Sequence, residues 1–177
     1  MIKNIIINFL LVLGLATAQI GLIGGLPNIL TGVNLVIIAL VFSLALFDFQ
    51  SAAYLALGVG LIEDVYSFLP FGLHLASLLL TLLAINFLYK SFFTNRSLYS
   101  FAALVALANL IYLFLQKIIE FSLNYFSGQG GAVYAGASFW ISALNILVLN
   151  AILTVMIFYI INYLSHRFKP VFLLRKK

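Results

Sequence analysis

Runs of apolar residues occupy most of this chain, and each long run is long enough, or nearly so, to cross a lipid bilayer. A hydrocarbon core about 30 Å thick needs about 20 helical residues at about 1.5 Å per residue. The sequence is 65% hydrophobic and only 7% charged, which is more apolar surface than a water-soluble domain can bury. The runs show no alternation of apolar and polar residues, so barrel strands are not expected. We therefore predict an all-α integral membrane protein.

The breaks between the runs predict a six-transmembrane-helix bundle that forms a single domain over residues 1–177. The expected spans are 5–23, 33–47, 52–66, 72–93, 98–126 and 138–164. The second and third spans are short for a full crossing, so we expect neighbouring helices to shield them from lipid. The first span ends near Ala16-Thr17-Ala18 and also resembles a cleavable signal peptide. The apolar sequence that follows favours a retained helix, and Gly21 and Gly25 indicate close helix packing there.

The distribution of basic residues predicts the orientation of these spans. Every Lys and Arg except Lys117 lies at Lys3, within 90–96 or within the tail 167–177. Loops rich in Lys and Arg remain on the cytoplasmic side of a membrane. Six spans place all three segments on that side, whereas five spans would divide them. We therefore expect both termini to be cytoplasmic.

The sequence lacks the motifs of several common chemistries. It contains no Cys, which excludes disulfides and thiolate metal sites, and its two His residues are expected at opposite membrane faces, which argues against a metal site. There is no Gly-x-Ser-x-Gly, His-Glu-x-x-His or phosphate-binding Gly loop. Asp48 and Asp64 are expected at opposite ends of the third span, too far apart for an aspartyl dyad. We expect neither an enzyme nor a cofactor, and no nucleic-acid partner.

Asp64 lies at the end of the third span, where a carboxylate needs an explanation. It follows Ala52, Ala56 and Gly60 at intervals of four residues, so all four share one helical face. Small residues let another helix approach closely. Asp64 is then either a solvated acid at the membrane surface or a buried acid that holds a turn or a partner helix. Glu63 points about 100° away and does not form a ready-made pair with Asp64.

A Pro-Phe-Gly sequence at 70–72 predicts a tight turn before the fourth span. Proline fixes one φ angle and Gly72 relaxes the next, so the following helix begins at a fixed place. His74 falls in the first turn of that helix, with Ser77 and Thr81 on the same face. We expect His74 to be a hydrogen-bonded packing residue.

A polar stripe runs along the fifth span. Its members recur at steps of three and four residues: Asn109, Tyr112, Gln116, Glu120 and Asn124. This spacing places them on one helical face, and Lys117 precedes Glu120 by three residues and can pair with it. The stripe either faces the bundle and bonds to its neighbours or lines a substrate cavity. A weaker set on the sixth span comprises Ser138, Ser142 and Asn145.

The block 60–75 resembles the signature of the bacterial rod-shape-determining protein MreD family. The matching positions are Gly60, Leu61, Asp64, Phe71, Gly72, Leu73 and His74. Length, six spans, a basic C-terminal tail and a polar fifth span are all compatible with that family. One departure lies at the head of the second span, where the family often has an acidic residue and this chain has Asn34.

The resemblance implies a non-catalytic scaffold subunit of the cell-wall elongation complex, placed in the bacterial inner membrane. The implied partners are membrane lipid, an MreC-like protein, a RodA-type glycan polymerase with its transpeptidase, and an MreB-like filament; a homodimer is left open. The family is also distantly similar to the substrate-binding membrane subunits of energy-coupling-factor transporters, so a vitamin-type binding subunit is the alternative. A small enzyme acting on lipid is a third hypothesis. The residues assigned a partner-binding or structural role are Ala52, Ala56, Gly60, Asp64, Phe71, Gly72 and His74.

Overall fold

The computed structural model describes residues 2–25, 32–67, 69–91, 98–126 and 137–167, and all regular secondary structure in these ranges is helical. Helix α1 (Ile2–Thr17) continues into a short π-helix, η1 (Ala18–Ile23). The remaining helices are α2 (Leu35–Leu46), α3 (Phe49–Tyr66), α4 (Leu73–Ser91), α5 (Leu98–Phe126) and α6 (Ala137–Arg167). They lie on the six apolar runs of the sequence, although α3 begins at Phe49, ahead of the run assigned to it.

Three of the described helices contain stretches long and apolar enough to cross a membrane. These stretches are Leu73–Ser91 in α4, Leu98–Leu123 in α5 and Trp140–Ile161 in α6. Two shorter apolar helical stretches cover Leu10–Gly21 and Leu35–Leu46. The all-helical structure and the lengths of these helices are those of a helical membrane protein.

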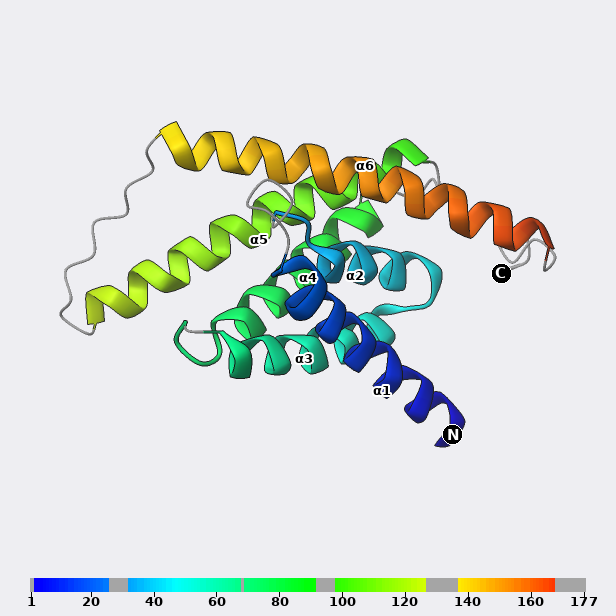
Figure 1. Ribbon diagram of the computed structural model, residues 1–177, viewed down its shortest axis with the longest axis horizontal. Coiled ribbons are helices and arrows are strands. Elements are labelled where there is room, and N and C mark those ends of the chain that lie inside the picture. The colour runs from blue at the N-terminus through cyan, green and yellow to red at the C-terminus, as the bar shows by residue number, and fades with distance from the viewer. Residues whose placement is uncertain (1, 26–31, 68, 92–97, 127–136, 168–177) are drawn as a thin grey trace.

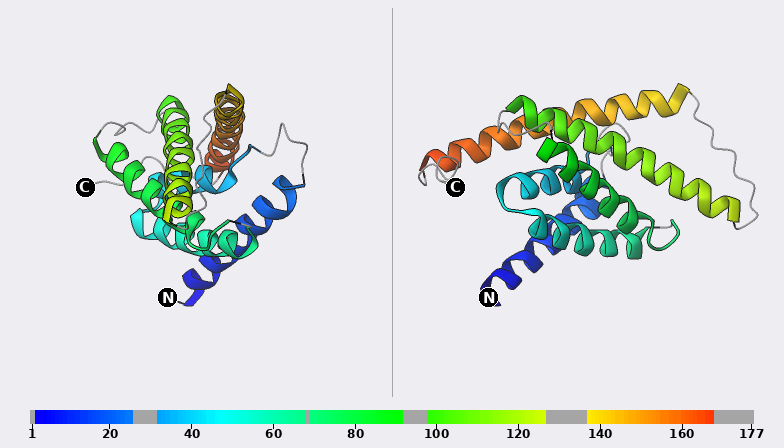
Figure 2. Two further views of the ribbon diagram at one scale, coloured as in Figure 1. Left: turned by 90° about the vertical axis from the view of Figure 1, so that its left-hand side faces the viewer. Right: turned by 180° about the vertical axis from the view of Figure 1, so that it is seen from behind.

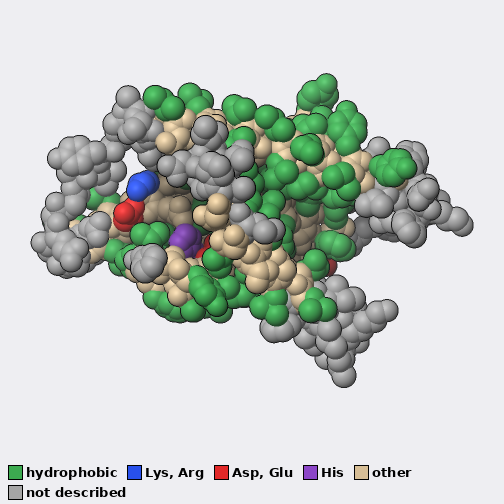
Figure 3. All heavy atoms as spheres, in the orientation of Figure 1, with side chains coloured by type: hydrophobic (Ala, Val, Ile, Leu, Met, Phe, Trp, Pro, Cys, Tyr) green, Lys and Arg blue, Asp and Glu red, His purple; other side chains and the backbone are tan. Residues whose placement is uncertain are grey.

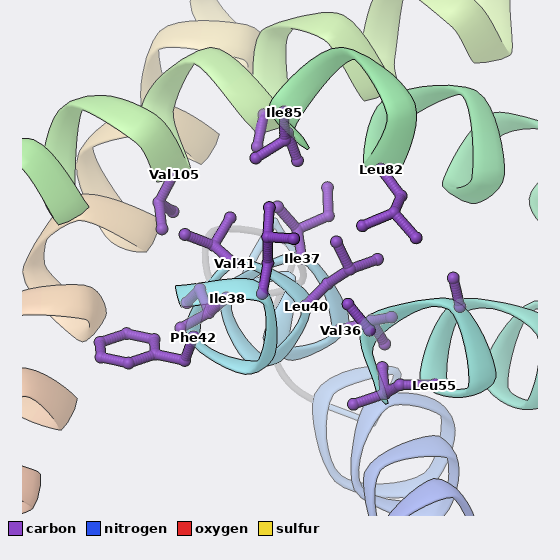
Figure 4. Packing of buried hydrophobic residues seen from close by; sticks show 14 of the residues in the cluster. Val36, Ile37, Ile38, Leu40, Val41, Phe42, Leu55, Leu82, Ile85 and Val105 are labelled. Atoms are coloured by element: carbon purple, nitrogen blue, oxygen red, sulfur yellow. The ribbon is translucent and has the colours of Figure 1, made fainter. Parts of the chain in front are cut away.

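Helix α2 is packed among the other helices of the molecule (Figure 4). Every residue from Val36 to Ala45 except Ala39 is buried, and α2 contacts α3, α4 and α5 as well as α1 and α6. Its side chains meet Leu82 of α4 and Val105 of α5 (Figure 4). A helix that is apolar on all sides must be surrounded by apolar material. Here that material is protein, so this short helix is shielded by its neighbours, as the sequence predicted.

Helices α5 and α6 form an open V along one side of the molecule (Figures 1 and 2). They approach each other near the start of α5, where the rings of Phe101 and Phe158 lie 5.7 Å apart. Phe101 also stacks on Phe42 of α2, with 4.9 Å between the ring centroids. The two helices diverge toward the end of α5 and the start of α6 (Figures 1 and 2). Helix α6 is therefore attached mainly through one half and is exposed along much of its length.

Helix α3 makes close contacts on two sides through its glycines. A Cβ atom added to Gly60 would lie 2.9 Å from the Cα atom of Leu75 in α4, and one added to Gly58 would lie 2.6 Å from a methyl group of Val12 in α1. Both distances are shorter than carbon atoms tolerate. At Gly60 the near atom belongs to the backbone of α4, so glycine is needed for the two helices to approach, whereas at Gly58 the near atom belongs to a side chain. Gly21, by contrast, is exposed, and a Cβ there would meet no atom within 4 Å. The close packing predicted at Gly21 is therefore wrong.

The small-residue face of α3 (Ala52, Ala56 and Gly60) is covered within the chain. Ala52 and Ala56 are completely buried, and Gly60 is buried against α4. The sequence left a partner-binding and a structural role open for this face. Its burial against α4 and other helices of this chain supports the structural role.

Candidate functional site

The first turn of α4 is capped by a side chain from α3. Gly72 has a φ of +93°, which favours glycine, and its carbonyl accepts the first helical hydrogen bond from the Ala76 N–H at 2.9 Å. Gly72 therefore occupies the N-cap position but has no side chain with which to cap the helix. Asp64 supplies the missing acceptor: its Oδ1 accepts from the His74 N–H at 2.8 Å and its Oδ2 from the Leu75 N–H at 3.1 Å.

Asp64 is buried, with 3% of its surface exposed. Of the two alternatives open from the sequence, the structure therefore has the buried acid that holds a turn together. A carboxylate at a helix N-terminus interacts favourably with the helix dipole and makes strong, charge-assisted hydrogen bonds. Gly60 lies one turn earlier and lets α3 approach Leu75, which brings Asp64 within reach of the start of α4. Gly60, Asp64 and Gly72 thus fix one helix junction together.

The ring of His74 lies between α3, α4 and α5. Its Nδ1 atom is 3.0 Å from Tyr112 Oη and 3.1 Å from Gln116 Nε2, and Gln116 Nε2 donates a hydrogen bond to Tyr112 Oη at 2.9 Å. The expectation of a hydrogen-bonded His74 is confirmed. The same Nδ1 atom lies 3.7 Å from Glu63 Oε2. We call His74, Tyr112, Gln116 and Glu63 the His74 cluster.

Glu63 is the member of this cluster that sequence reasoning missed. Its direction was expected to differ from that of Asp64, and it does: Asp64 binds the backbone of His74 while Glu63 approaches the ring. Only 12% of the Glu63 side chain and 16% of the His74 side chain are exposed. The sequence did contain a signal, because the chain has only four acidic residues and Glu63 stands directly beside Asp64.

The polar stripe of α5 divides among three environments. Tyr112 and Gln116 belong to the His74 cluster, whereas Asn109 faces α6. Lys117 and Glu120 form a partly exposed ion pair with Nζ and Oε2 2.7 Å apart, which confirms their expected pairing. The side chain of Asn124 lies outside the described part of the chain. In Figure 3, basic, acidic and histidine side chains lie near one another at the end of the molecule where α5 and α6 diverge.

A second polar cluster surrounds Asn150 of α6, which is completely buried. Its Nδ2 donates to the carbonyls of Gly32 and Ile146 at 3.1 and 2.9 Å. The same atom lies 3.3 Å from Asn109 Oδ1. Its Oδ1 accepts from the Asn34 N–H at 2.8 Å. Asn150 therefore ties α5 and α6 to the segment that leads into α2.

The N-terminus of α2 is held by two further amide side chains. Asn34 Oδ1 accepts from the Ile37 N–H at 3.0 Å and caps the helix. Gln19 of η1 donates to the Val33 carbonyl at 3.1 Å and accepts from the Leu35 N–H at 2.9 Å. The first N–H groups of a helix lack intrahelical partners, and inside a membrane protein other protein groups must satisfy them. The position where the resembling family often has an acid is thus an amide cap here.

These four amide residues (Gln19, Asn34, Asn109 and Asn150) form what we call the amide clamp. The sequence drew attention to Asn34 and Asn109 but missed Gln19 and Asn150. Both missed residues are amides inside apolar runs, and such residues usually find partners on other helices. That rule could have identified them, although it could not have named the partners.

The hydrogen bonds of these two clusters join the helices of the bundle to one another. Most polar atoms of the His74 cluster and the amide clamp are paired with other protein atoms. Within the described ranges no group of three or more His, Asp or Glu side chains could hold a metal ion. The buried hydroxyls of Ser77 and Thr81 have no hydrogen-bond partner among the described residues. Comparisons with protein-family models, curated proteins and solved structures gave no match to this chain.

Proposed function

We propose that this chain is a non-catalytic scaffold subunit of the bacterial cell-wall elongation complex. The proposal rests on the resemblance of the block 60–75 to the MreD family and on one structural observation inside that block. Both carboxylate oxygens of Asp64 are engaged by backbone N–H groups of α4. A carboxylate that is buried and has both oxygens bound by the backbone of its own chain is poorly placed to meet a substrate, and this arrangement supports a structural role.

The proposed topology is six spans with both termini cytoplasmic, in the inner membrane. The clustering of Lys and Arg into three segments supports it. Helix α2 has 12 residues and covers only about 18 Å at about 1.5 Å per residue. Its enclosure by neighbouring helices lets so short a span lie within the bundle. A bundle of this kind has the general plan of the substrate-binding subunits of energy-coupling-factor transporters, which is the proposed fold relationship.

The proposed partners are an MreC-like protein, a RodA-type polymerase with its transpeptidase, and an MreB-like filament. Since the small-residue face of α3 is covered within the chain, we expect partner proteins to bind helix surfaces that are exposed. Helix α6 offers a row of exposed apolar side chains that includes Leu144, Val148, Ile152, Met156 and Ile160. In a membrane this row meets lipid or the apolar helix of another chain.

Affinity purification from native membranes tests the scaffold proposal. A tagged chain extracted in mild detergent is expected to bring down the MreC-like and RodA-type proteins. Val148→Trp on the exposed row of α6 is expected to reduce that recovery several-fold, while Leu80→Trp on an exposed part of α4 is the matched control and retains it. Recovery of no elongation protein with the wild-type chain would refute the scaffold function. Equal recovery with both variants would show that the partner proteins do not contact the exposed row of α6.

The alternative function is a vitamin-type binding subunit of an energy-coupling-factor transporter. The observation that favours it is that the His74 cluster is only part-buried and that histidine, acidic and basic side chains lie near one another at the end of the molecule where α5 and α6 diverge (Figure 3). Such a subunit would retain a small molecule through purification, and Gln116→Leu would release it. Mass spectrometry of small molecules extracted from the purified protein distinguishes the two functions, because a scaffold yields none that depends on Gln116.

A further inference from the structure

Two buried asparagines lie near the middle of helices that are long and apolar enough to cross a membrane. The apolar stretch of α5 is Leu98–Leu123 and that of α6 is Trp140–Ile161. Asn109 and Asn150 are each at least ten residues from either end of their stretch. At about 1.5 Å per residue, this is about 15 Å or more, which is half of a hydrocarbon core about 30 Å thick. Because the middle of a crossing helix is near the membrane mid-plane at any tilt, both asparagines belong at that level.

Aromatic side chains at the ends of the same helices give the same level. Tyr99 near the start of α5 and Tyr163 near the end of α6 are exposed, as are Tyr125 and Trp140 at the opposite ends. Tyr and Trp are enriched at the two interfaces of a membrane. The two asparagines lie within three residues of the midpoints between these aromatic positions. Helix length and aromatic positions therefore agree on the mid-plane.

Helix α2 begins at the level of these asparagines. The Nδ2 atom of Asn150 lies 3.3 Å from Asn109 Oδ1, and the same side chain bonds to the Asn34 N–H at 2.8 Å and the Gly32 carbonyl at 3.1 Å. The backbone at these two bonded positions is not helical, and α2 starts directly afterwards at Leu35. The start of α2 is therefore within one side-chain length of the mid-plane.

From this level α2 runs toward the side on which α5 begins. Phe42 of α2 stacks on Phe101, with 4.9 Å between the ring centroids, and Phe101 is only three residues from the start of α5. The basic segment 90–96 precedes that start and marks the cytoplasmic side. In Figure 1, α2 lies in the same half of the molecule as the start of α1 and the end of α6. The 12 residues of α2 cover about 18 Å, which is little more than half of the hydrocarbon core.

We propose that α2 is a half-span, a helix that begins at the mid-plane and occupies only the cytoplasmic half of the membrane. Irregular backbone at this depth must be satisfied by other protein groups. Asn150 does this at the two positions above, and Gln19 of η1 does it for the Val33 carbonyl and the Leu35 N–H. The inference requires that the chain lie in a membrane, but it does not depend on the scaffold function. Both termini remain cytoplasmic, because α2 still ends on the cytoplasmic side.

The amide clamp is then a fastening at the mid-plane. Substrate sites in many transporters lie at such breaks, where the N-terminus of a half-helix points at the substrate. In this chain the N–H groups of Asn34, Leu35 and Ile37 are instead bound by amide side chains of the same chain. The break is thus held by the protein itself. In the outer half of the membrane, α5 and α6 diverge (Figures 1 and 2) beyond the start of α2.

Spin labels along α6 test the depth of the Asn150 level. The chain contains no Cys, so single-Cys variants of the full-length chain can be labelled and placed in lipid nanodiscs. The labels are placed at the exposed positions Ile141, Val148, Ile152 and Tyr163, and their collisions with oxygen and with a water-soluble nickel chelate are measured by electron paramagnetic resonance. Oxygen concentrates at the bilayer centre, whereas the chelate is excluded from it. We expect the ratio of oxygen to nickel collisions to be several-fold higher at Val148 and Ile152 than at the other two positions. A maximum at Ile141 or Tyr163 would overturn the proposal.

A disulfide tests whether α2 begins beside this part of α6. A Cβ atom added to Gly32 would lie 3.6 Å from the Cβ atom of Ile146, within the range that a disulfide spans. Oxidation of Gly32→Cys/Ile146→Cys in native membranes is expected to remove both free thiols, with the linked peptide identified by mass spectrometry. The control pair Gly32→Cys/Ile160→Cys places the second thiol near the cytoplasmic end of α6 and is expected to keep its thiols. No disulfide in the first pair, or equal oxidation of both pairs, would overturn the proposal.

The end of α2 gives a measurement that does not require the paired variants to fold. Phe47 follows the last residue of α2 and is exposed, so a spin label there reports the depth at which the helix ends. A half-span predicts that the label at Phe47 collides with the nickel chelate as often as the label at Tyr163. If α2 instead began at the outer face, a helix of about 18 Å would end near the bilayer centre. A label at Phe47 with the oxygen-to-nickel ratio of Val148 would therefore refute the half-span.

Discussion

Replacing Asp64 by Ala tests the helix junction most directly. The change removes a buried acceptor of two backbone hydrogen bonds, from the His74 and Leu75 N–H groups. A hydrogen bond to a charged group contributes about 1.5–3 kcal/mol, whereas a water-exposed cap contributes only about 0.5–2 kcal/mol. Because Asp64 is buried, the free energy lost on its removal should exceed that of an exposed cap. The loss should remain below the sum of two charged hydrogen bonds, because the variant no longer buries a charge. We expect a loss of about 3 kcal/mol, which corresponds to a decrease in Tm of roughly 6–12 °C.

The matched control is Asp48→Ala. Asp48 stands at the N-cap position of α3 but is exposed and makes no side-chain cap bond, so its loss is expected to cost less than about 0.5 kcal/mol. Asp64→Asn retains one acceptor oxygen and is expected to lose about half as much stability as Asp64→Ala. Hydrogen exchange of the α4 amides should accelerate in Asp64→Ala but not in Asp48→Ala. If both Ala variants unfold at the same temperature, Asp64 is not the cap of α4.

Three further substitutions and one control, Gly14→Ala, probe the other contacts, each by thermal unfolding in detergent. Gly60→Val forces α4 away from α3 and is expected to cost about 1–3 kcal/mol, while Gly14→Ala, which meets no neighbouring atom, is expected to be neutral or slightly stabilising. Asn150→Leu leaves the Asn34 N–H without its partner and is expected to cost at least about 1–3 kcal/mol. Gly72→Ala places a Cβ at a φ of +93° and is expected to cost about 1–2 kcal/mol.

The positions of the helices could be predicted from the sequence because the lipid environment leaves few alternatives. A backbone that satisfies its own hydrogen bonds in an apolar medium must be helical wherever an apolar run is long enough. The short run at α2 was expected to be shielded by neighbours, and its apolar residues on all sides explain why. The start of α3 at Phe49 was missed, although Asp48 at its N-cap position is a usual start signal. Which helices surround α2 depends on side-chain packing, which one-dimensional periodicity does not contain.

The candidate site was predictable where its residues share a local spacing. Asp64 stood out because it continues a four-residue repeat, and Tyr112 and Gln116 because they share a stripe on α5. The amide clamp was harder to predict from the sequence, since the bond between Asn34 and Asn150 joins positions 116 residues apart. Local periodicity carries no information on such pairs. An amide in an apolar helix predicts that a partner exists but not where it lies.

The small-residue face of α3 illustrates a limit of sequence patterns. They predict a close helix contact, but not whether the neighbouring helix belongs to the same chain. Small residues in a membrane helix indicate a close backbone approach, and the approach exists, but it is made to Leu75 of the same chain. Any Gly60 variant that weakens recovery of a partner protein should therefore do so by destabilising the chain. Across Gly60→Ala, Gly60→Val and Gly60→Leu, we expect partner recovery to fall in step with Tm. A Gly60 variant with the wild-type Tm and no partner recovery would contradict this, because it would require the glycine to contact the partner directly.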